Sequence, residues 1–241
     1  PIQSLHHDPD NHRLLIGKQN GELDVYNSQT WEFESRVNTG EDNLVSAFFS
    51  TNTKRIYTGF KNGTIGFYDI SKNRLLRKIE LNSTLHCMTI GTNPDVIYVG
   101  LDANQSVLIH GEEGKIIKRF FHYEGGVPTS AAIDRAGITL YLGTKDRIFQ
   151  YNRLNQTVNV FEWPGIDIQM SPNEDRLWTL GKTLSLYDLS IQTTLTEQPV
   201  DGTILKVSPD GDIAAVGNSN GTLTIRHPDF NSLRQWKAHN G

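Results

Sequence analysis

The feature that most constrains the fold of this chain is a pattern that recurs six times along it. Each copy has an apolar strand that ends, in five copies, in glycine. A polar turn and a second strand follow, and this strand ends in Tyr-Asp or Tyr-Asn in four copies. The aligned positions at the end of the first strand are spaced by 42, 41, 43, 37 and 37 residues: Gly17, Gly59, Gly100, Gly143, Leu180 and Gly217. A period of about 40 residues is that of a four-stranded propeller blade.

Two further strands can be placed in each repeat. Thirteen residues before each aligned position lies a mostly small residue: Ser4, Ser46, Cys87, Ser130, Asp167 and Ile204. We assign these residues to the innermost strands, because those strands converge on a central channel where small side chains fit best. The second strand of each copy leads through a turn to an outer strand, at Trp31–Val37, Arg74–Glu80, Ile116–Phe121, Val158–Phe161, Ile191–Thr196 and Leu233–Trp236. No segment has a sustained helical period of 3.6 residues.

The repeats predict an all-β fold, a single β-propeller domain over residues 1–241 with six four-stranded antiparallel blades. The expected blades cover approximately residues 1–40, 41–81, 82–124, 125–163, 164–199 and 200–241. The chain starts on an innermost strand and stops after an outer strand and a corner. Six blades could therefore close the ring directly, or these blades belong to a seven-bladed ring, and the presence of flanking domains is open.

At this point the residues resemble the WD-repeat (WD40) family across essentially the whole chain. Ser208–Gly211, followed by Ile213–Gly217 and Asn220–Leu223, is similar to a near-consensus repeat, and Ala238–Gly241 resembles the Gly-His corner that precedes a new blade. The repeats are divergent, because Tyr-Asp stands for Trp-Asp and the corner histidine occurs once, at His239. The resemblance implies a propeller that binds other proteins.

Composition narrows the class of partner and the compartment. The chain has 23 basic and 27 acidic residues, well mixed, for a net charge of −4. Without a basic stripe, we expect no nucleic-acid binding. No apolar run approaches the ~18 residues of a membrane span, so we expect no membrane association. Cys87 is the single cysteine, and this favours the reducing cytoplasm or nucleus.

The sequence offers little that could carry catalysis. Cys87 is next to His86, but adjacent side chains on a strand point to opposite faces. The histidines lack the spacing of metal ligands, so we predict no metal and no cofactor. Asp167 is the one acidic residue in the small innermost-strand position, and we expect it to accept hydrogen bonds there. We therefore predict a protein without catalytic residues, and the alternative is a propeller hydrolase or a quinoprotein-like enzyme with a site at the channel mouth.

The connections from each outer strand to the next innermost strand, here called corners, are expected to gather on one face of the ring. They cover Asn38–Asn43, Leu81–Ser83, His122–Val127, Glu162–Gly165, Gln198–Gly202 and Lys237–Gly241. Aromatic residues dominate interface hot spots. The candidate protein-binding residues on this face are Tyr123 and Trp163, with Glu41, Asp42 and Asp201 as an acidic rim and His239 at the last corner. The alternative for both aromatic residues is that each packs onto its own blade.

We therefore predict a non-catalytic scaffold for protein–protein interaction within a larger intracellular assembly, as part of a longer chain or as one subunit of a complex. An acidic rim would favour basic peptides. A purely architectural domain of a larger polypeptide is a further alternative. The binding partner, the pathway and the face that binds are left open by the sequence.

Overall fold

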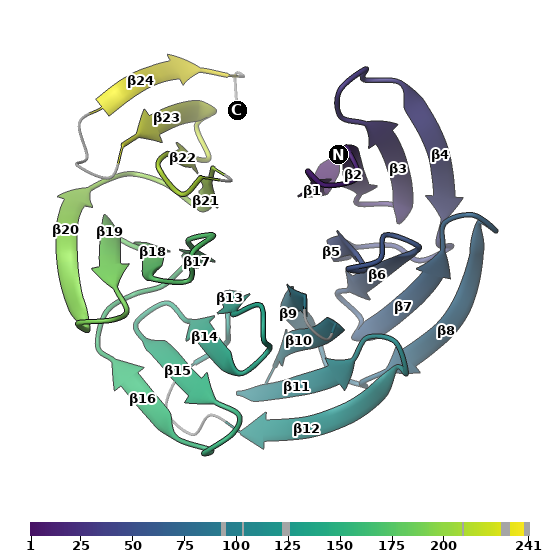
Figure 1. Cartoon of the computed structure of the whole chain (residues 1–241), viewed down its shortest axis with the longest axis horizontal. Coiled ribbons are helices and arrows are strands. Elements are labelled where there is room, and N and C mark those ends of the chain that lie inside the picture. The colour runs from purple at the N-terminus through teal and green to yellow at the C-terminus, as the bar shows by residue number, and fades with distance from the viewer. Residues whose placement is uncertain (93–94, 103, 122–125, 209, 228–231, 239–241) are drawn as a thin grey trace. The chain divides into compact units, whose positions relative to one another are not determined.

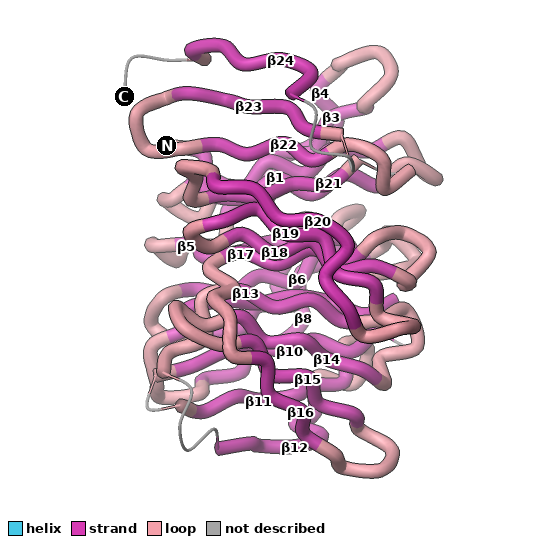
Figure 2. The backbone as a smooth tube through the Cα atoms, turned by 90° about the vertical axis from the view of Figure 1, so that its left-hand side faces the viewer, coloured by secondary structure: helices cyan, strands magenta, loops and turns pink. Residues whose placement is uncertain are grey.

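The computed structural model contains 24 strands and, among the residues that it describes, no helix (Figures 1 and 2). It describes the whole chain except residues 93–94, 103, 122–125, 209, 228–231 and 239–241. The strands form six sheets, each with four antiparallel strands that are adjacent in sequence order. The predicted fold class is confirmed: the chain is all-β, with six four-stranded antiparallel blades of the β-propeller type.

The first of two compact units holds three blades. It comprises Pro1–Val127 and Arg135–Gly137. Blade 1 consists of β1 (Ile2–Asp8), β2 (Arg13–Lys18), β3 (Glu22–Asn27) and β4 (Phe33–Asn38). Blade 2 consists of β5 (Leu44–Phe49), β6 (Arg55–Phe60), β7 (Thr64–Asp69) and β8 (Arg74–Glu80). Blade 3 consists of β9 (Leu85–Thr92), β10 (Asp95–Leu101), β11 (Gln105–His110) and β12 (Lys115–Phe121).

The second unit, Pro128–Asp134 and Ile138–Gly241, holds the other three blades. Blade 4 consists of β13 (Ser130–Ile133), β14 (Thr139–Gly143), β15 (Ile148–Asn152) and β16 (Val158–Phe161). Blade 5 consists of β17 (Asp167–Met170), β18 (Arg176–Leu180), β19 (Thr183–Asp188) and β20 (Thr193–Pro199). Blade 6 consists of β21 (Ile204–Val207), β22 (Ala214–Gly217), β23 (Thr222–Arg226) and β24 (Ser232–Lys237). That residues 1–241 form a single domain stays a prediction.

The strand register explains the spacing of thirteen residues in the repeat. In every blade the small innermost-strand residue lies directly opposite the aligned residue of the second strand. The six pairs are Ser4 with Gly17, Ser46 with Gly59, Cys87 with Gly100, Ser130 with Gly143, Asp167 with Leu180, and Ile204 with Gly217. The thirteen positions therefore separate two residues that face each other on the two strands of one hairpin.

In blades 1 and 4 the aligned glycine is required by the close approach of the next part of the chain. A Cβ atom on Gly17 would lie 2.4 Å from the Leu44 side chain of blade 2. A Cβ on Gly143 would lie 2.0 Å from the carbonyl oxygen of Gly165, in the corner that leads to blade 5. Either contact is far inside van der Waals distance, so the glycines permit neighbouring blades to pack at this level.

The hydrophobic core lies between consecutive blades within each unit. Leu15, Leu23 and Val25 of blade 1 are buried against blade 2. The interfaces between blades 2 and 3, 4 and 5, and 5 and 6 have clusters of the same kind. Truncation of one such leucine to alanine typically costs about 2–5 kcal/mol. Because the second and third strands carry most of these residues, their apolar runs are the strongest signal in the sequence.

The Tyr-Asp and Tyr-Asn pairs end the third strand and begin a hairpin turn. Tyr68 is buried between blades 1 and 2, and the carboxylate of Asp69 accepts hydrogen bonds from Ser71 Oγ and Lys72 N (2.7 and 3.0 Å). Asn27, Asn152 and Asp188 close the equivalent turns of blades 1, 4 and 5 in the same way. The pair thus joins a core tyrosine to an Asx turn.

The predicted start of the outer strand is two residues early in blades 1 and 5, at Trp31 and at Ile191. Trp31 was expected to begin the outer strand of blade 1, but it lies in the turn before β4, with φ 61° and 68% of its surface exposed. The reason is local, because Trp31 N donates to the carbonyl oxygen of Asn27 (2.9 Å) and closes the turn. The outer strand therefore begins at Phe33.

Candidate functional site

The corners of the first unit are held to the hairpin turns that connect the second and third strands. Asn43 N donates to the carbonyl of Gln19 (2.7 Å), and Lys61 N donates to the carbonyl of Asn43 (2.9 Å). In blade 3, Asp102 N donates in the same way to the carbonyl of Thr84 (3.0 Å). Each corner is thus bonded by its backbone to a neighbouring turn, and the result is a firmly supported surface.

Two residues of the predicted acidic rim lie in the first of these corners. The carboxylate of Glu41 accepts hydrogen bonds from Lys78 Nζ (2.6 Å) and Asn62 Nδ2 (3.2 Å). The Lys78 ammonium, with a smaller contribution from Asn62, lowers the pKa of Glu41 below its ordinary value. Asp42 is exposed beside it. The negative charge of Glu41 is therefore largely compensated, and Asp42 is the more available of the two carboxylates.

A histidine–carboxylate pair on the same corners was not found from the sequence. His86 Nε2 lies 2.5 Å from Asp102 Oδ1, and both side chains are partly exposed. Hydrogen bonds from Thr84 and then His86 lower the pKa of Asp102. His86 is on β9 and Asp102 lies in the turn after β10, 16 positions away, and no local pattern joins them. Cys87, next to His86, is buried opposite Gly100.

The second unit contains Trp163 and Asp201. Trp163 is half-buried and packs against Phe161 and Tyr187, with ring centroids 5.0 and 5.2 Å away. The aromatic residue is thus anchored on blades 4 and 5. Asp201 is exposed, and its carboxylate lies 3.5 Å from the amide nitrogen of Asn218.

The other two predicted site residues, Tyr123 and His239, lie outside the described residues. Glu41 and Asp42 fall in the first compact unit, and Trp163 and Asp201 in the second. All six residues remain predictions as contacts for a partner.

A small hollow opens beside Trp163. It has a volume of about 90 Å³. Its lining comes from the corner after β16 and from strands β18, β19 and β20: Trp163, Pro164, Thr179, Thr183, Ser185, Tyr187, Thr194 and Glu197. We call it the tryptophan hollow.

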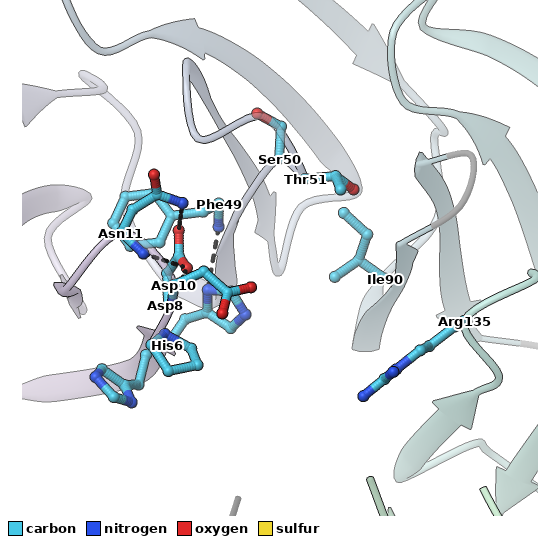
Figure 3. Close-up of a pocket in the computed structure, with 11 residues that line it drawn as sticks. His6, Asp8, Asp10, Asn11, Phe49, Ser50, Thr51, Ile90 and Arg135 are labelled. Carbon is cyan, nitrogen blue, oxygen red and sulfur yellow. Dashed lines mark hydrogen bonds between the residues drawn. The ribbon is translucent and has the colours of Figure 1, made fainter. Parts of the chain in front are cut away.

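A larger cavity, of about 550 Å³, lies in the first unit (Figure 3). It is at the ends of the innermost strands that are farthest from the corners. The residues around it come from the end of β1 and its turn, from the end of β5, and from β9 and the loop after β13: His6, His7, Asp8, Pro9, Asp10, Asn11, Phe49, Ser50, Thr51, Ile90 and Arg135. Its volume lies within the usual range for ligand pockets, roughly 300–1,000 Å³.

Several side chains at the larger cavity have structural partners. Phe49 N donates to His6 Nδ1 (3.2 Å), and Asp8 Oδ1 accepts hydrogen bonds from Asp10 N and Asn11 N (3.1 and 3.2 Å). The bond to Phe49 joins His6 of blade 1 to blade 2. The cavity itself could not be found from the sequence, because strand ends from different blades form it.

Asp167 behaves as the sequence predicted. It is partly buried, and its Oδ2 accepts a hydrogen bond from Leu205 N (2.8 Å). Burial is the largest effect on its carboxyl group and raises its pKa above the ordinary value.

Two features are absent from the described residues. These residues contain no group of three or more His, Cys, Asp or Glu side chains that could hold a metal ion. In the same part of the chain there is also no helix of the length and apolarity needed to cross a membrane.

Six blades of four sequential antiparallel strands give this chain the β-propeller fold. Its repeat of about 40 residues, with a Tyr-Asx pair at the end of the third strand in four blades, resembles that of the WD-repeat propellers. No family model matches it. A similar curated protein is U3 small nucleolar RNA-associated protein 21 of Saccharomyces cerevisiae. The two are 26% identical over 186 residues, which make up 70% of this chain and 18% of that protein. The match thus covers less than two thirds of the relative's length.

Proposed function

We propose that this chain is a non-catalytic protein-interaction scaffold in a nuclear assembly, and that it binds partner proteins through its corners. The observation that carries the proposal is the backbone bonding of corners to hairpin turns, for example Asn43 N to the carbonyl of Gln19 (2.7 Å). Interface loops that are already ordered lose little conformational entropy when a partner binds. Rigid corners are therefore suited to specific recognition.

The curated relative supports the cellular setting. Its name associates it with a small nucleolar RNA. We infer that this chain takes part in a comparable assembly in the nucleus. Its own net charge of −4 favours contacts with proteins rather than with the RNA backbone.

Affinity capture with charge-reversed corners tests this function. The chain serves as bait in a nuclear extract, beside a variant with Asp42→Lys and Asp201→Lys. Both aspartates are exposed corner residues, so the fold should survive. The control is Glu112→Lys, an exposed residue in the turn between β11 and β12, at the other end of its sheet from the corners.

We expect a set of proteins that the parent and the Glu112→Lys control both capture and that the corner variant loses. If the corner variant captures the same proteins as the parent, these corners are not the binding surface. If none of the baits captures a protein above background, the scaffold function itself is contradicted.

A further inference from the structure

The tryptophan hollow combines an aromatic wall, a polar floor and an uncompensated carboxylate. We propose that it binds the side chain of an arginine from a partner protein. The proposal rests on the scaffold function, since it names the chemistry by which one surface of the second unit recognises a partner.

The wall of the hollow is formed by aromatic rings in a fixed arrangement. Trp163 and Tyr187 both line it, with ring centroids 5.2 Å apart and planes inclined by 53°. Phe161 packs against both rings from blade 4, at 5.0 and 5.5 Å between centroids. At these separations the three rings are in mutual contact, so a ligand stacks against the wall and does not enter between the rings. Tryptophan is the aromatic residue that attracts a stacked cation most strongly.

The floor is made of small hydroxyl side chains. Thr183 Oγ1 and Ser185 Oγ lie 3.2 Å apart, and Thr179 and Thr194 also line the hollow. Small residues at these positions leave the space open, and their oxygen atoms can accept hydrogen bonds from N–H donors. Thr183 and Ser185 hydrogen-bond to each other, and an aliphatic ligand would offer their oxygen atoms no further donor.

Glu197 supplies the charge. It is exposed on β20, and among the described residues its carboxylate has no ion pair or hydrogen bond. The neighbouring carboxylate of Glu162 is different, because Arg147 Nε lies 3.0 Å from it. Glu197 is therefore a negative charge at the hollow that has no counterion among the described residues.

The size of the hollow limits what can enter. At about 90 Å³ it is well below the roughly 300 Å³ of a small-molecule pocket, and it holds about three water volumes. The end of one side chain fits, whereas a cofactor does not.

Arginine fits these features better than lysine does. Its guanidinium group is planar, so it can stack on an indole ring while its edge donates to a carboxylate and to hydroxyl oxygens. A lysine ammonium is compact and strongly hydrated, and it cannot stack. The combination of flat aromatic wall and separate acceptors therefore favours arginine.

The test uses the full chain labelled with 5-fluorotryptophan, which gives one ¹⁹F signal for each of the four tryptophans. The signal of Trp163 is assigned with the Trp163→Phe variant. The probes are three blocked tripeptides, Ac-Gly-Arg-Gly-NH₂ and its lysine and citrulline counterparts. Citrulline has nearly the shape of arginine but no charge.

We expect the arginine peptide to shift the Trp163 signal with saturation, and the citrulline peptide to bind more weakly. Glu197→Gln should weaken arginine binding about fivefold, because one charge-assisted contact is lost. Glu112→Gln, which removes an exposed carboxylate from blade 3, should leave binding unchanged.

Three results would overturn the proposal: an arginine peptide that leaves the Trp163 signal in place, equal binding of the citrulline or lysine peptide, or equal binding to the Glu197→Gln variant. Because the exposed Glu197 carboxylate has no hydrogen bond or ion pair within the described fold, its replacement by glutamine should leave blade 5 folded. The arginine peptide could fail to bind the hollow while the corner variant still loses the captured proteins. That result would overturn the arginine proposal and leave the scaffold function standing.

Discussion

The carboxylate of Asp167 accepts a hydrogen bond from the backbone N–H of Leu205, with 2.8 Å between Oδ2 and N, and this bond joins β17 of blade 5 to β21 of blade 6. Ser4 has the same role in the first unit, where Ala47 N donates to its Oγ (3.0 Å). The small innermost-strand position of the repeat thus connects the innermost strands of consecutive blades. Asp167 connects them with a group that can ionise.

Replacement of Asp167 by asparagine should change how stability depends on pH. Burial raises the folded-state pKa of Asp167 above 3.8. Its contribution to stability is therefore full below about pH 3.8 and is lost as the pH rises through the raised pKa. Asparagine keeps an acceptor oxygen and cannot ionise. We expect Asp167→Asn to gain stability relative to the parent as the pH rises from about 4 to about 7.

The measurement is the free energy of unfolding in urea for both proteins across this pH range. A constant difference between the two proteins would contradict a raised pKa. Asp167→Ala is the control for the hydrogen bond itself. It leaves Leu205 N without its acceptor and should cost about 1–3 kcal/mol.

The sequence predicted the repeat, and with it the positions of Ser4 and Asp167 on innermost strands, because these depend on spacing within one hairpin. The Tyr-Asx pairs were equally visible, since a turn is a local structure. Contacts between blades were not predicted. Glu41 and Lys78, or His86 and Asp102, meet only after a loop folds against a strand that is distant in sequence. The tryptophan hollow and the larger cavity were not predicted either, because the residues that line each of them come from separate strands and loops.

Tyr57 should contribute to stability through a buried hydrogen bond between blades 2 and 3. Its hydroxyl group donates to Asp95 Oδ2 at 2.7 Å, and both residues are buried. Burial and then Asp95 raise the pKa of Tyr57, so the hydroxyl stays protonated at neutral pH. Tyr57→Phe leaves that carboxylate oxygen without its donor and should lower the free energy of unfolding by about 1–3 kcal/mol.

Tyr141→Phe is the matched control for this prediction. Tyr141 is buried to a similar degree, but its hydroxyl oxygen accepts a hydrogen bond from Gln150 Nε2 (2.8 Å), and Gln150 is only partly buried. Water can replace the lost partner, so a cost of about 0.5–1.5 kcal/mol is expected. Urea unfolding compares the two variants, and a smaller loss for Tyr57→Phe would contradict the importance of the bond to Asp95.

The ionisation of Glu41 should depend on Lys78. The ammonium group holds the pKa of Glu41 below its ordinary value of 4.5, so the ion pair persists as the pH falls until that lowered pKa is reached. Lys78→Met removes the charge and should move the pKa of Glu41 upward. The check is a ¹³C NMR titration of the Glu41 carboxyl group in both proteins. A Glu41 pKa that is unchanged in the variant would show that Asn62, the other donor, determines it.

Gly63→Ala should lower the free energy of unfolding more than backbone strain alone explains, because the added methyl group would press on a neighbouring corner. Gly63 has φ 84°, and a Cβ atom there would lie 2.2 Å from the carbonyl oxygen of Ser83 in the corner between blades 2 and 3. Gly40 has a similar φ of 71°, but a Cβ on it would meet nothing within 4 Å. Gly40→Ala should therefore cost only the left-handed conformation, about 1–2 kcal/mol. Gly63→Ala should cost at least about 1 kcal/mol more, because the turn must also move away from the corner. Urea unfolding measures both variants, and equal costs would mean that the turn and the corner are not in firm contact.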